Sequence, residues 1–369
     1  MGKDKGNNIR RRGDGQAGIC KLSVCVVSEG QGHAFPVHLP DGMALPRDNR
    51  AMRFLSGLSP RATGLLAAVV TVAIWTSFIV IARASAQFTL GPYDIAFARI
   101  LGASAVLLPV GWWMVRQQRA AGTLAPGGGW LGLSPLAFRI SAVCGFFGGL
   151  MYAVLAYAGF FHAPAAHASV LMPGSLPLWT TLLAALILKD RITPARAAGL
   201  ACILAGDLLV GGASLLSAFD GGDIWKGDLL FMAAAFCWST YSVLARRHAL
   251  GAVEATIAIT LFALITYVPG YLLLSTLDVL HSRLGAAPWG EIAFQALFQG
   301  VGSVAISGVT FTLMIRHYGP VRSTMITALV PGLSALGAVL FLGEPLGWNL
   351  LAGLALVTAG ILFGVRRMR

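Results

Sequence analysis

The sequence predicts an all-α polytopic membrane protein with ten transmembrane helices, arranged as two inverted five-helix repeats. Three observations lead to this fold class. Hydrophobic residues make up 56% of the chain and charged residues only 11%, whereas soluble domains carry about 25% charged residues. Uncharged apolar runs recur along most of the sequence. Finally, segments of the first half match segments of the second half in the same order.

The apolar runs have the length that a bilayer requires. A helix needs about 20 apolar residues to cross roughly 30 Å of hydrocarbon. The run at 140–188 is long enough for two helices, and Pro164 marks the turn between them. The first run resembles a signal peptide, but its apolar core exceeds the usual length of about 7–15 residues, so we expect it to be retained. We predict helices at 63–82, 94–115, 140–161, 166–188, 196–217, 227–246, 254–276, 291–314, 321–342 and 348–366.

Residues 1–61 differ from the rest of the chain, because they are polar, basic and glycine-rich and have no hydrophobic period. Such a segment cannot bury enough apolar surface to order itself, so we expect a disordered tail. Met43 and Met52 are alternative start positions within it. The remaining chain divides into a first repeat at 62–217 and a second repeat at 218–369.

Two shifts reveal the internal repeat. A shift of 154 residues overlays the fourth and fifth predicted helices on the ninth and tenth; it places Pro177 on Pro331, Asp190 on Glu344, Gly199 on Gly353 and Gly206 on Gly360. A shift of 163 residues overlays the first helix on the sixth; it places Gly64 on Gly227, Trp75 on Trp238 and Arg83 on Arg246. Each unit has an odd number of helices, so the second unit enters the membrane from the opposite side.

The distribution of positive charge predicts the orientation, because Lys and Arg concentrate in cytoplasmic loops. With the N-terminus inside, the outside loops hold only Arg83, Lys226 and Arg283. The inside segments after residue 62 hold Arg116, Arg119, Arg139, Lys189, Arg191, Arg196, Arg246, Arg247, Arg316, Arg322, Arg366, Arg367 and Arg369. We therefore predict a cytoplasmic (inner) membrane protein with cytoplasmic N- and C-termini. The net charge of +12 forms no basic stripe with interleaved aromatics, so no nucleic-acid partner is expected.

These repeated residues resemble the drug/metabolite transporter superfamily, in its ten-helix EamA-type branch. The resemblance covers about residues 63–366 and is carried by Pro177, Asp190, Gly199, Gly206, Pro331, the segment Ala338-Val339-Leu340-Phe341-Leu342-Gly343-Glu344-Pro345, Gly353 and Gly360. Trp75, Arg99 and Trp238 fit the same pattern, whereas Lys189-Asp190 departs from the family's usual Gly-Glu. The resemblance implies a transporter that exports or exchanges amino acids or other small metabolites through a central cavity between the repeats.

Two ionisable residues fall inside predicted helices, where a charge is costly and therefore a candidate for function. Asp207 lies near the middle of the fifth helix, and exclusion from water favours its protonated form. It is a candidate for proton coupling or for binding a substrate amine; the alternative is a hydrogen bond to a neighbouring helix. Arg99 is a candidate counter-charge for a substrate carboxylate; the alternative is snorkelling to the interface or capping of backbone carbonyls.

Uncharged side chains near mid-helix extend the predicted substrate pathway. Each polar group at this depth needs a partner or water, so it lines a cavity or forms an interhelical hydrogen bond. The aromatic faces suit apolar or cationic solutes, and plain helix packing is their alternative. The residues are Trp75, Tyr152, Trp238, Tyr241, Gln299 and Ser303. Pro177 and Pro331 are hinge candidates, since each removes a backbone donor and bends its helix, and a static kink is the alternative.

The sequence carries no HExxH, GxSxG or Walker A motif, so no catalytic residue, metal or cofactor is predicted. The expected partners are the lipid bilayer and a small-molecule substrate, with protons and a homodimeric second copy left open. Two other functions also stay open. A carrier of lipid-linked substrates would need a cavity that opens sideways. A membrane-embedded enzyme would need an acidic cluster, for which Asp220-Gly221-Gly222-Asp223 is the one candidate.

Overall fold

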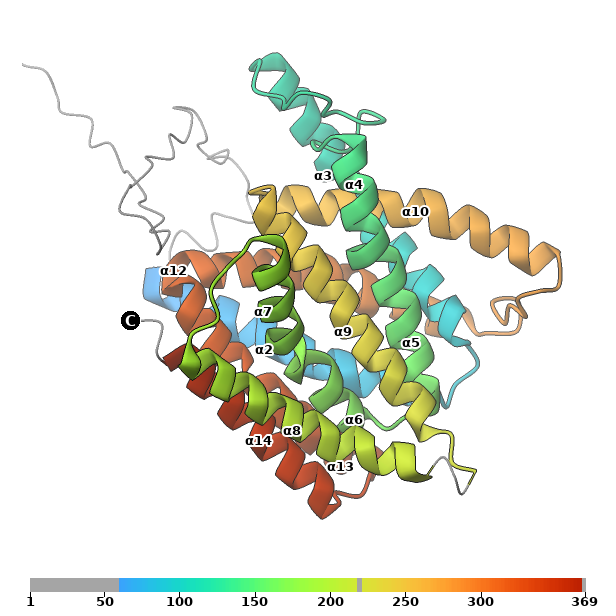
Figure 1. Ribbon diagram of the computed structural model, residues 1–369. Coiled ribbons are helices and arrows are strands. Elements are labelled where there is room, and N and C mark those ends of the chain that lie inside the picture. Colours follow the sequence, from blue (N-terminus) through green and yellow to red (C-terminus); the bar gives the residue numbers. More distant parts are fainter. Residues whose placement is uncertain (1–59, 218–220, 367–369) are drawn as a thin grey trace, which may run out of the picture. The chain divides into compact units, whose positions relative to one another are not determined.

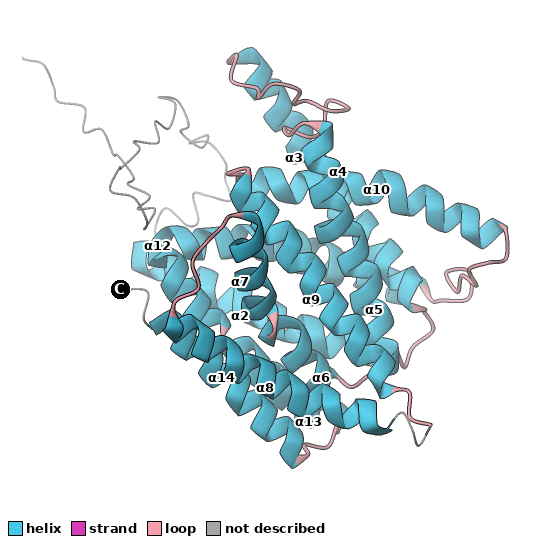
Figure 2. Ribbon diagram, viewed as in Figure 1, coloured by secondary structure: helices cyan, strands magenta, loops and turns pink. Residues whose placement is uncertain are grey.

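The computed structural model describes residues 60–217 and 221–366, and within these ranges every regular element is helical (Figure 2). In this described part of the chain, eight helices are long and apolar enough to cross a membrane, and two shorter apolar helices follow at Leu329–Leu342 and Trp348–Phe363. The prediction of an all-α polytopic membrane protein is therefore confirmed. The predicted tail lies outside the described residues, apart from its last two, which already belong to the first helix.

The first half of the chain forms five membrane-crossing segments whose bounds agree with hydropathy to within a few residues. Two of them are interrupted by π-helical turns, in which hydrogen bonds run to the fifth residue instead of the fourth. The segments are α2 (Pro60–Ser85); α3 (Pro92–Ala120); α4 (Phe138–Gly145) with η1 (Phe146–Met151) and α5 (Tyr152–His162); α6 (Ala165–Ser169) with η2 (Val170–Gly174) and α7 (Leu176–Ile187); and α8 (Pro194–Ser217).

The second half repeats this plan with one difference. Its elements are α9 (Ile224–Arg247); α10 (Ala252–Thr276); α11 (Trp289–Gln295) with η4 (Ala296–Ile306) and α12 (Ser307–Thr327); α13 (Leu329–Leu342); and α14 (Trp348–Arg366). We predicted a loop between 314 and 321, but α12 continues to Thr327 and the break falls at Ala328. Polar residues such as His317 end an apolar run without ending a helix, because backbone hydrogen bonds do not depend on side-chain polarity.

Helices α8 and α14 lie side by side (Figure 1) and meet at four glycines. A Cβ on Gly206 would lie 2.6 Å from the carbonyl oxygen of Gly353, and one on Gly353 would lie 2.9 Å from that of Gly206. A Cβ on Gly360 would lie 2.6 Å from the carbonyl oxygen of Gly199. Because small residues let backbones approach, this spacing is typical of tight helix pairs in membranes.

The pairing of these glycines is reciprocal. The sequence repeat equates Gly199 with Gly353 and Gly206 with Gly360, and each glycine of one repeat contacts the non-equivalent glycine of the other. Self-complementary contact of this kind is what a two-fold axis produces. It supports the proposal that the two halves are related as inverted repeats.

Helix α3 positions the residues considered below. It begins at Pro92, whose fixed φ suits the first helical turn, and the Asp94 side chain accepts a hydrogen bond from the Gly91 N–H at 2.8 Å. Farther along, α3 crosses η4 at two more glycines. A Cβ on Gly102 would lie 2.0 Å from the carbonyl oxygen of Ala296, and one on Gly300 would lie 2.6 Å from that of Arg99. This crossing therefore brings Arg99 against the π-helical turns of η4.

Candidate functional site

A cavity of about 1020 Å³ is enclosed by helices from both halves of the chain. Six of the predicted pathway residues line it, three from each half. The three π-helical segments within the described residues contribute lining residues as well, and such turns are frequent at functional sites. The six pathway residues are Trp75, Arg99, Tyr152, Trp238, Tyr241 and Ser303. Their proposed role in a substrate pathway remains a prediction that rests on this placement.

Arg99 is buried at the wall of the cavity and is held by neutral groups. Its Nη1 donates to the Tyr157 hydroxyl at 3.3 Å, to the Gln299 carbonyl at 3.2 Å and to the Ser303 hydroxyl at 3.2 Å. The guanidinium carbon lies 5.5 Å from the centre of the Phe78 ring. Gln299 and Ser303 both lie in the π-helical element η4, so one acceptor is a backbone carbonyl of a π-helical turn and the other is a side-chain hydroxyl.

Aromatic side chains form much of the remaining wall. The Trp238 ring packs between Tyr152 at 4.8 Å and Tyr241 at 5.3 Å, measured between ring centres. Trp75 packs against Phe311 at 5.1 Å. Since these residues also line the cavity, the wall presents large apolar faces with a few polar edges, as small-molecule pockets do.

Two predicted site residues lie outside the cavity lining. Asp207 is buried in α8, and neither of its carboxylate oxygens makes a hydrogen bond with the described residues. Gln299 is fully buried, and its side-chain amide also lacks a described partner, although its backbone carbonyl accepts from Arg99. Proton coupling by Asp207 and a substrate contact by the Gln299 side chain stay predictions.

Pro177 and Pro331 both line the cavity, and each follows a break in its helix. Pro177 lies in the first turn of α7, just after the break at Ser175. Pro331 lies in the first turn of α13, just after the break at Ala328. A proline in a first turn loses no intrahelical hydrogen bond, so the pair marks the start of the second half of each broken segment. Whether these points act as hinges remains a prediction.

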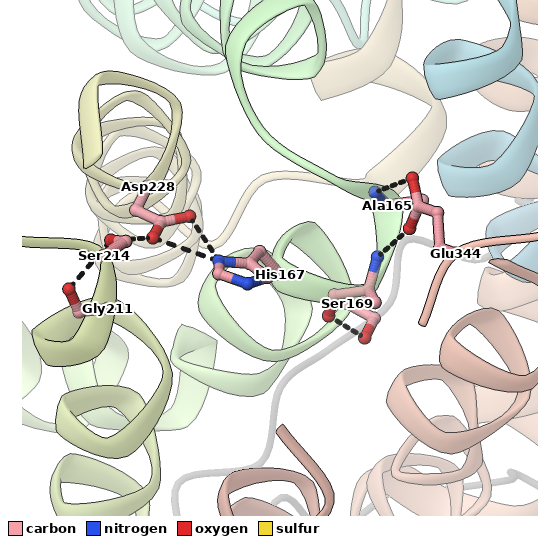
Figure 3. Close-up of polar contacts among 8 residues, drawn as sticks. Ala165, His167, Ser169, Gly211, Ser214, Asp228 and Glu344 are labelled. Carbon is pink, nitrogen blue, oxygen red and sulfur yellow. Dashed lines mark hydrogen bonds and ion pairs between the residues drawn. The ribbon is translucent and has the colours of Figure 1, made fainter. Parts of the chain in front are cut away.

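At one end of the fourth segment, five residues form what we call the Glu344 cluster: Arg83, Phe160, Ala165, Ala166 and Glu344. The Glu344 carboxylate accepts from the N–H groups of Ala165 and Ala166, both at 3.0 Å (Figure 3). Arg83 Nε lies 3.3 Å from Glu344, and Arg83 Nη1 donates to the Phe160 carbonyl at 2.7 Å. None of the five lines the cavity. The cluster therefore joins the ends of α2 and α5 to the start of α6 and to the α13–α14 loop.

Next to this cluster, His167 connects α6 to α9. Its Nδ1 lies 3.0 Å from Asp228 Oδ1, and the Ser214 hydroxyl donates to Asp228 Oδ2 (Figure 3). Asp228 is buried, so these two partners satisfy a carboxylate that would otherwise be costly in this environment. The α6 segment is thus fixed twice, by Glu344 at its first two N–H groups and by Asp228 at the side chain of its third residue, His167.

At the other end of the fourth segment lies what we call the Asp190 pair, in which Arg246 Nη1 donates to Asp190 Oδ2 at 2.8 Å. Both residues line the cavity. The side chains of Arg246 and Asp190 are 63% and 31% exposed, whereas those of Arg83 and Glu344 are 27% and 13% exposed. The cavity thus reaches exposed residues at the Asp190 pair, whereas the Glu344 cluster is less exposed and lies outside the lining.

Neither charge pair was among the predicted site residues, although the repeat contained the signal. The two shifts equate Asp190 with Glu344 and Arg83 with Arg246. One shift equates the two acids and the other equates the two bases, at equivalent helix ends. Sequence spacing alone does not show that the acid of one pair meets the base of the other, because the partners lie 56 and 261 residues apart.

The acidic cluster that an enzyme would use gains no support from its described member. Asp223 is exposed and pairs with Lys226 at 2.7 Å, and this hydrogen bond lowers the pKa of its carboxyl. Asp220 lies outside the described residues. Among residues 60–217 and 221–366, no group of three or more His, Cys, Asp and Glu side chains is placed to hold a metal ion.

The described residues thus form helices only and build a cavity lined from both halves of the chain, an arrangement that polytopic carriers share. The model of the EamA-like transporter family matches residues 62–212 and 225–366, so the chain belongs to that family. It is 26% identical over 232 residues to the uncharacterized transporter YyaM of Bacillus subtilis (strain 168), covering 62% of this chain and 72% of that protein.

A second relative agrees with this assignment, and a solved structure shares the fold. An uncharacterized transporter of Archaeoglobus fulgidus is 30% identical over 206 residues, covering 55% of this chain and 63% of that protein. A solved crystal structure matches 83% of this chain and 98% of its own, with a TM-score of 0.52 and 21% identity. At that identity the structural match shows the fold alone.

Proposed function

We propose that the protein is a secondary transporter that carries a small metabolite across the cytoplasmic membrane by alternating access. Membership of the family makes it a multi-pass membrane transporter with the bilayer as its surroundings. The proposal adds the mechanism. One observation carries it: equivalent charge pairs lie at opposite ends of the fourth segment, and only the more exposed pair lines the cavity.

The equivalence extends to the backbone around each acid. Asp190 N donates to the Ala184 carbonyl at 3.3 Å, and Glu344 N donates to the Ala338 carbonyl at 3.2 Å, which is the same contact displaced by one repeat. The preceding residues, Lys189 and Gly343, both have left-handed backbones, with φ of 58° and 67°. Two sequences thus build one local structure, although only glycine adopts this φ without strain.

This symmetry supports an exchange between two states. In the described state the Glu344 cluster closes one end with hydrogen bonds from two backbone N–H groups and one arginine. In the opposite state, we propose, the Asp190 pair would close its own end in the equivalent way and the Glu344 cluster would open. Inverted repeats permit this, because the two states are then related by the same pseudo-two-fold axis that relates the repeats.

The charge distribution supports an orientation with cytoplasmic N- and C-termini, which would place the Asp190 pair on the cytoplasmic side. The cavity of the described state would then face inward. Labelling of single cysteines introduced at Lys189 and at Glu344 with a membrane-impermeant thiol reagent tests the arrangement. Opposite sidedness is expected, and reaction of both positions from the same side would overturn the inverted repeat and the mechanism together.

Transport itself can be tested with purified protein in liposomes and a panel of radiolabelled amino acids, organic acids and amines. Saturable uptake of at least one solute is expected. For alternating access, Thr181→Cys places a thiol in the cavity lining. It is expected to react with an impermeant reagent from either side of the membrane. A folded protein that moves no member of the panel, or a thiol reached from one side only, would contradict the proposal.

A further inference from the structure

We propose that Arg99 binds the carboxylate of a small organic anion whose apolar or aromatic body lies against the tryptophans of the cavity. The inference rests on the transport function proposed above and names its substrate class. It follows from the free hydrogen-bonding capacity of Arg99, from the charges around the cavity, and from the aromatic wall beside it.

The guanidinium of Arg99 is only partly used. All three of its hydrogen bonds leave from Nη1, and Nη2 and Nε make none with residues 60–217 and 221–366. These two nitrogens form one edge of a planar fork whose spacing matches the two oxygens of a carboxylate. The contacts to Tyr157, Gln299 and Ser303 therefore hold the group in place and leave a bidentate edge for a ligand.

Arg99 also lacks a counter-charge. No carboxylate in the part of the chain that the structure describes lies within ion-pair distance of it, and its three acceptors are neutral. Arginine keeps its proton in proteins, so it cannot escape this environment by becoming neutral. A buried charge without a partner is unfavourable, and an incoming anion removes that cost.

The charges around the cavity decide between anionic and cationic solutes. Aromatic walls bind cations well, so the tryptophans alone leave the sign of the substrate open. The described lining residues, however, include four arginines and one acid. The acid, Asp190, is paired with Arg246, and the other arginines are Arg99, Arg191 and Arg196. A cleft lined by one sign of charge concentrates the opposite sign, so this cavity favours anions.

The order of these charges along the cavity gives the anion a path. At the exposed end of the cavity, Arg191 precedes α8, Arg196 lies in the first turn of α8 and Arg246 lies in the last turn of α9. Arg99 instead lies in α3 beside the aromatic wall. Trp75, Tyr152 and Trp238 then offer apolar faces to the part of the ligand that carries no charge. The geometry therefore suits a monocarboxylate with a hydrophobic body better than a sugar, a polyamine or a small inorganic anion.

Three matched compounds test the substrate class. Phenylacetate, 2-phenylethanol and phenethylamine share a phenyl ring on a short chain and end in a carboxylate, a hydroxyl and an ammonium group. The measurement is the apparent unfolding temperature of the purified full-length protein, which a ligand of the folded state raises. Phenylacetate is expected to raise it, and the other two are not at the same concentration. An equal effect of 2-phenylethanol would overturn the inference.

Variants of Arg99 locate the site. Arg99→Gln is expected to weaken phenylacetate binding at least about tenfold, since a charged hydrogen bond is lost. Arg99→Lys keeps the charge without the fork and is expected to be intermediate, which also protects the test against misfolding of Arg99→Gln. Arg283→Gln changes an exposed loop arginine and serves as the control. Unchanged phenylacetate binding in both Arg99 variants would exclude the subsite.

Failure of this inference can be told apart from failure of the transport proposal. If liposomes with wild-type protein take up amines or neutral solutes and no carboxylate binds, transport stands and the subsite falls. If phenylacetate binds through Arg99 and no solute of the panel crosses the membrane, the subsite stands and transport falls.

Discussion

Replacing Gly102 by alanine tests whether the α3–η4 crossing holds Arg99 in place. The new Cβ would lie 2.0 Å from the Ala296 carbonyl oxygen, and real Cβ contacts essentially never fall below 3.0 Å. Because the obstacle is backbone, α3 and η4 must separate by about 1 Å, which stretches the 3.2 Å hydrogen bonds from Arg99 to Gln299 and Ser303 beyond the useful range.

The expected loss in the free energy of unfolding is the sum of the overpacking cost and the cost of the weakened hydrogen bonds. Overpacking costs about 1–3 kcal/mol, and each weakened hydrogen bond of Arg99 adds about 0.5–1.5 kcal/mol. With the two bonds to η4 weakened, we therefore expect Gly102→Ala to lower the free energy of unfolding by about 2–6 kcal/mol and to weaken phenylacetate binding. Thermal unfolding in detergent measures the first effect, and ligand-induced shifts measure the second.

A matched control separates crowding from the loss of glycine itself. Gly212 lies in the interior of α8, and a Cβ there would have no neighbour within 4 Å. Gly212→Ala is expected to be neutral or stabilising by about 0.4–1 kcal/mol, because the unfolded chain loses freedom. If Gly102→Ala unfolds at the same temperature as Gly212→Ala, the helices are not in close contact at this crossing.

Three further substitutions follow from the charged residues. Glu344→Gln is expected to loosen the Glu344 cluster and to raise thiol labelling of the cavity from that side, whereas Asp223→Asn, in an exposed pair, is expected to leave labelling unchanged; equal labelling in both would contradict the gating role. Asp228→Asn is expected to lower the free energy of unfolding by about 1–3 kcal/mol, because it weakens a buried hydrogen-bonded carboxylate, and thermal unfolding would show this. Asp207→Asn is expected to keep phenylacetate binding and to abolish transport driven by a pH gradient; full gradient-driven transport would exclude Asp207 as the proton carrier.

Hydropathy predicted the transmembrane segments well because bilayer thickness sets a common length for all of them. It failed between 314 and 321, where α12 continues to Thr327. It also gave no sign of the π-helical turns, which side-chain polarity does not encode. Gly300 lies in one of these turns, but only the structure shows that α3 packs closely against it.

The sequence predicted how deep in the membrane each site residue lies better than it predicted which face of its helix the residue occupies. Trp75 and Trp238 were found because the repeat equates them, and both line the cavity. Asp207 lies at a suitable depth, yet it is absent from the lining. Residue number sets how deep a side chain lies, whereas the face it occupies depends on which helices pack around it. Contacts between distant segments, such as Arg83 with Glu344, require the folded structure.

The four-glycine contact between α8 and α14 has a mechanical consequence. Two rods that touch backbone to backbone at points about two turns apart resist both sliding and separation, because any shift drives atoms already at contact distance into each other. During a transport cycle these two helices would have to travel as one fixed frame. The remaining helices of each repeat would then rotate against this frame. Such a rotation would bend the chain at the helix breaks that precede α7 and α13, at Ser175 and Ala328.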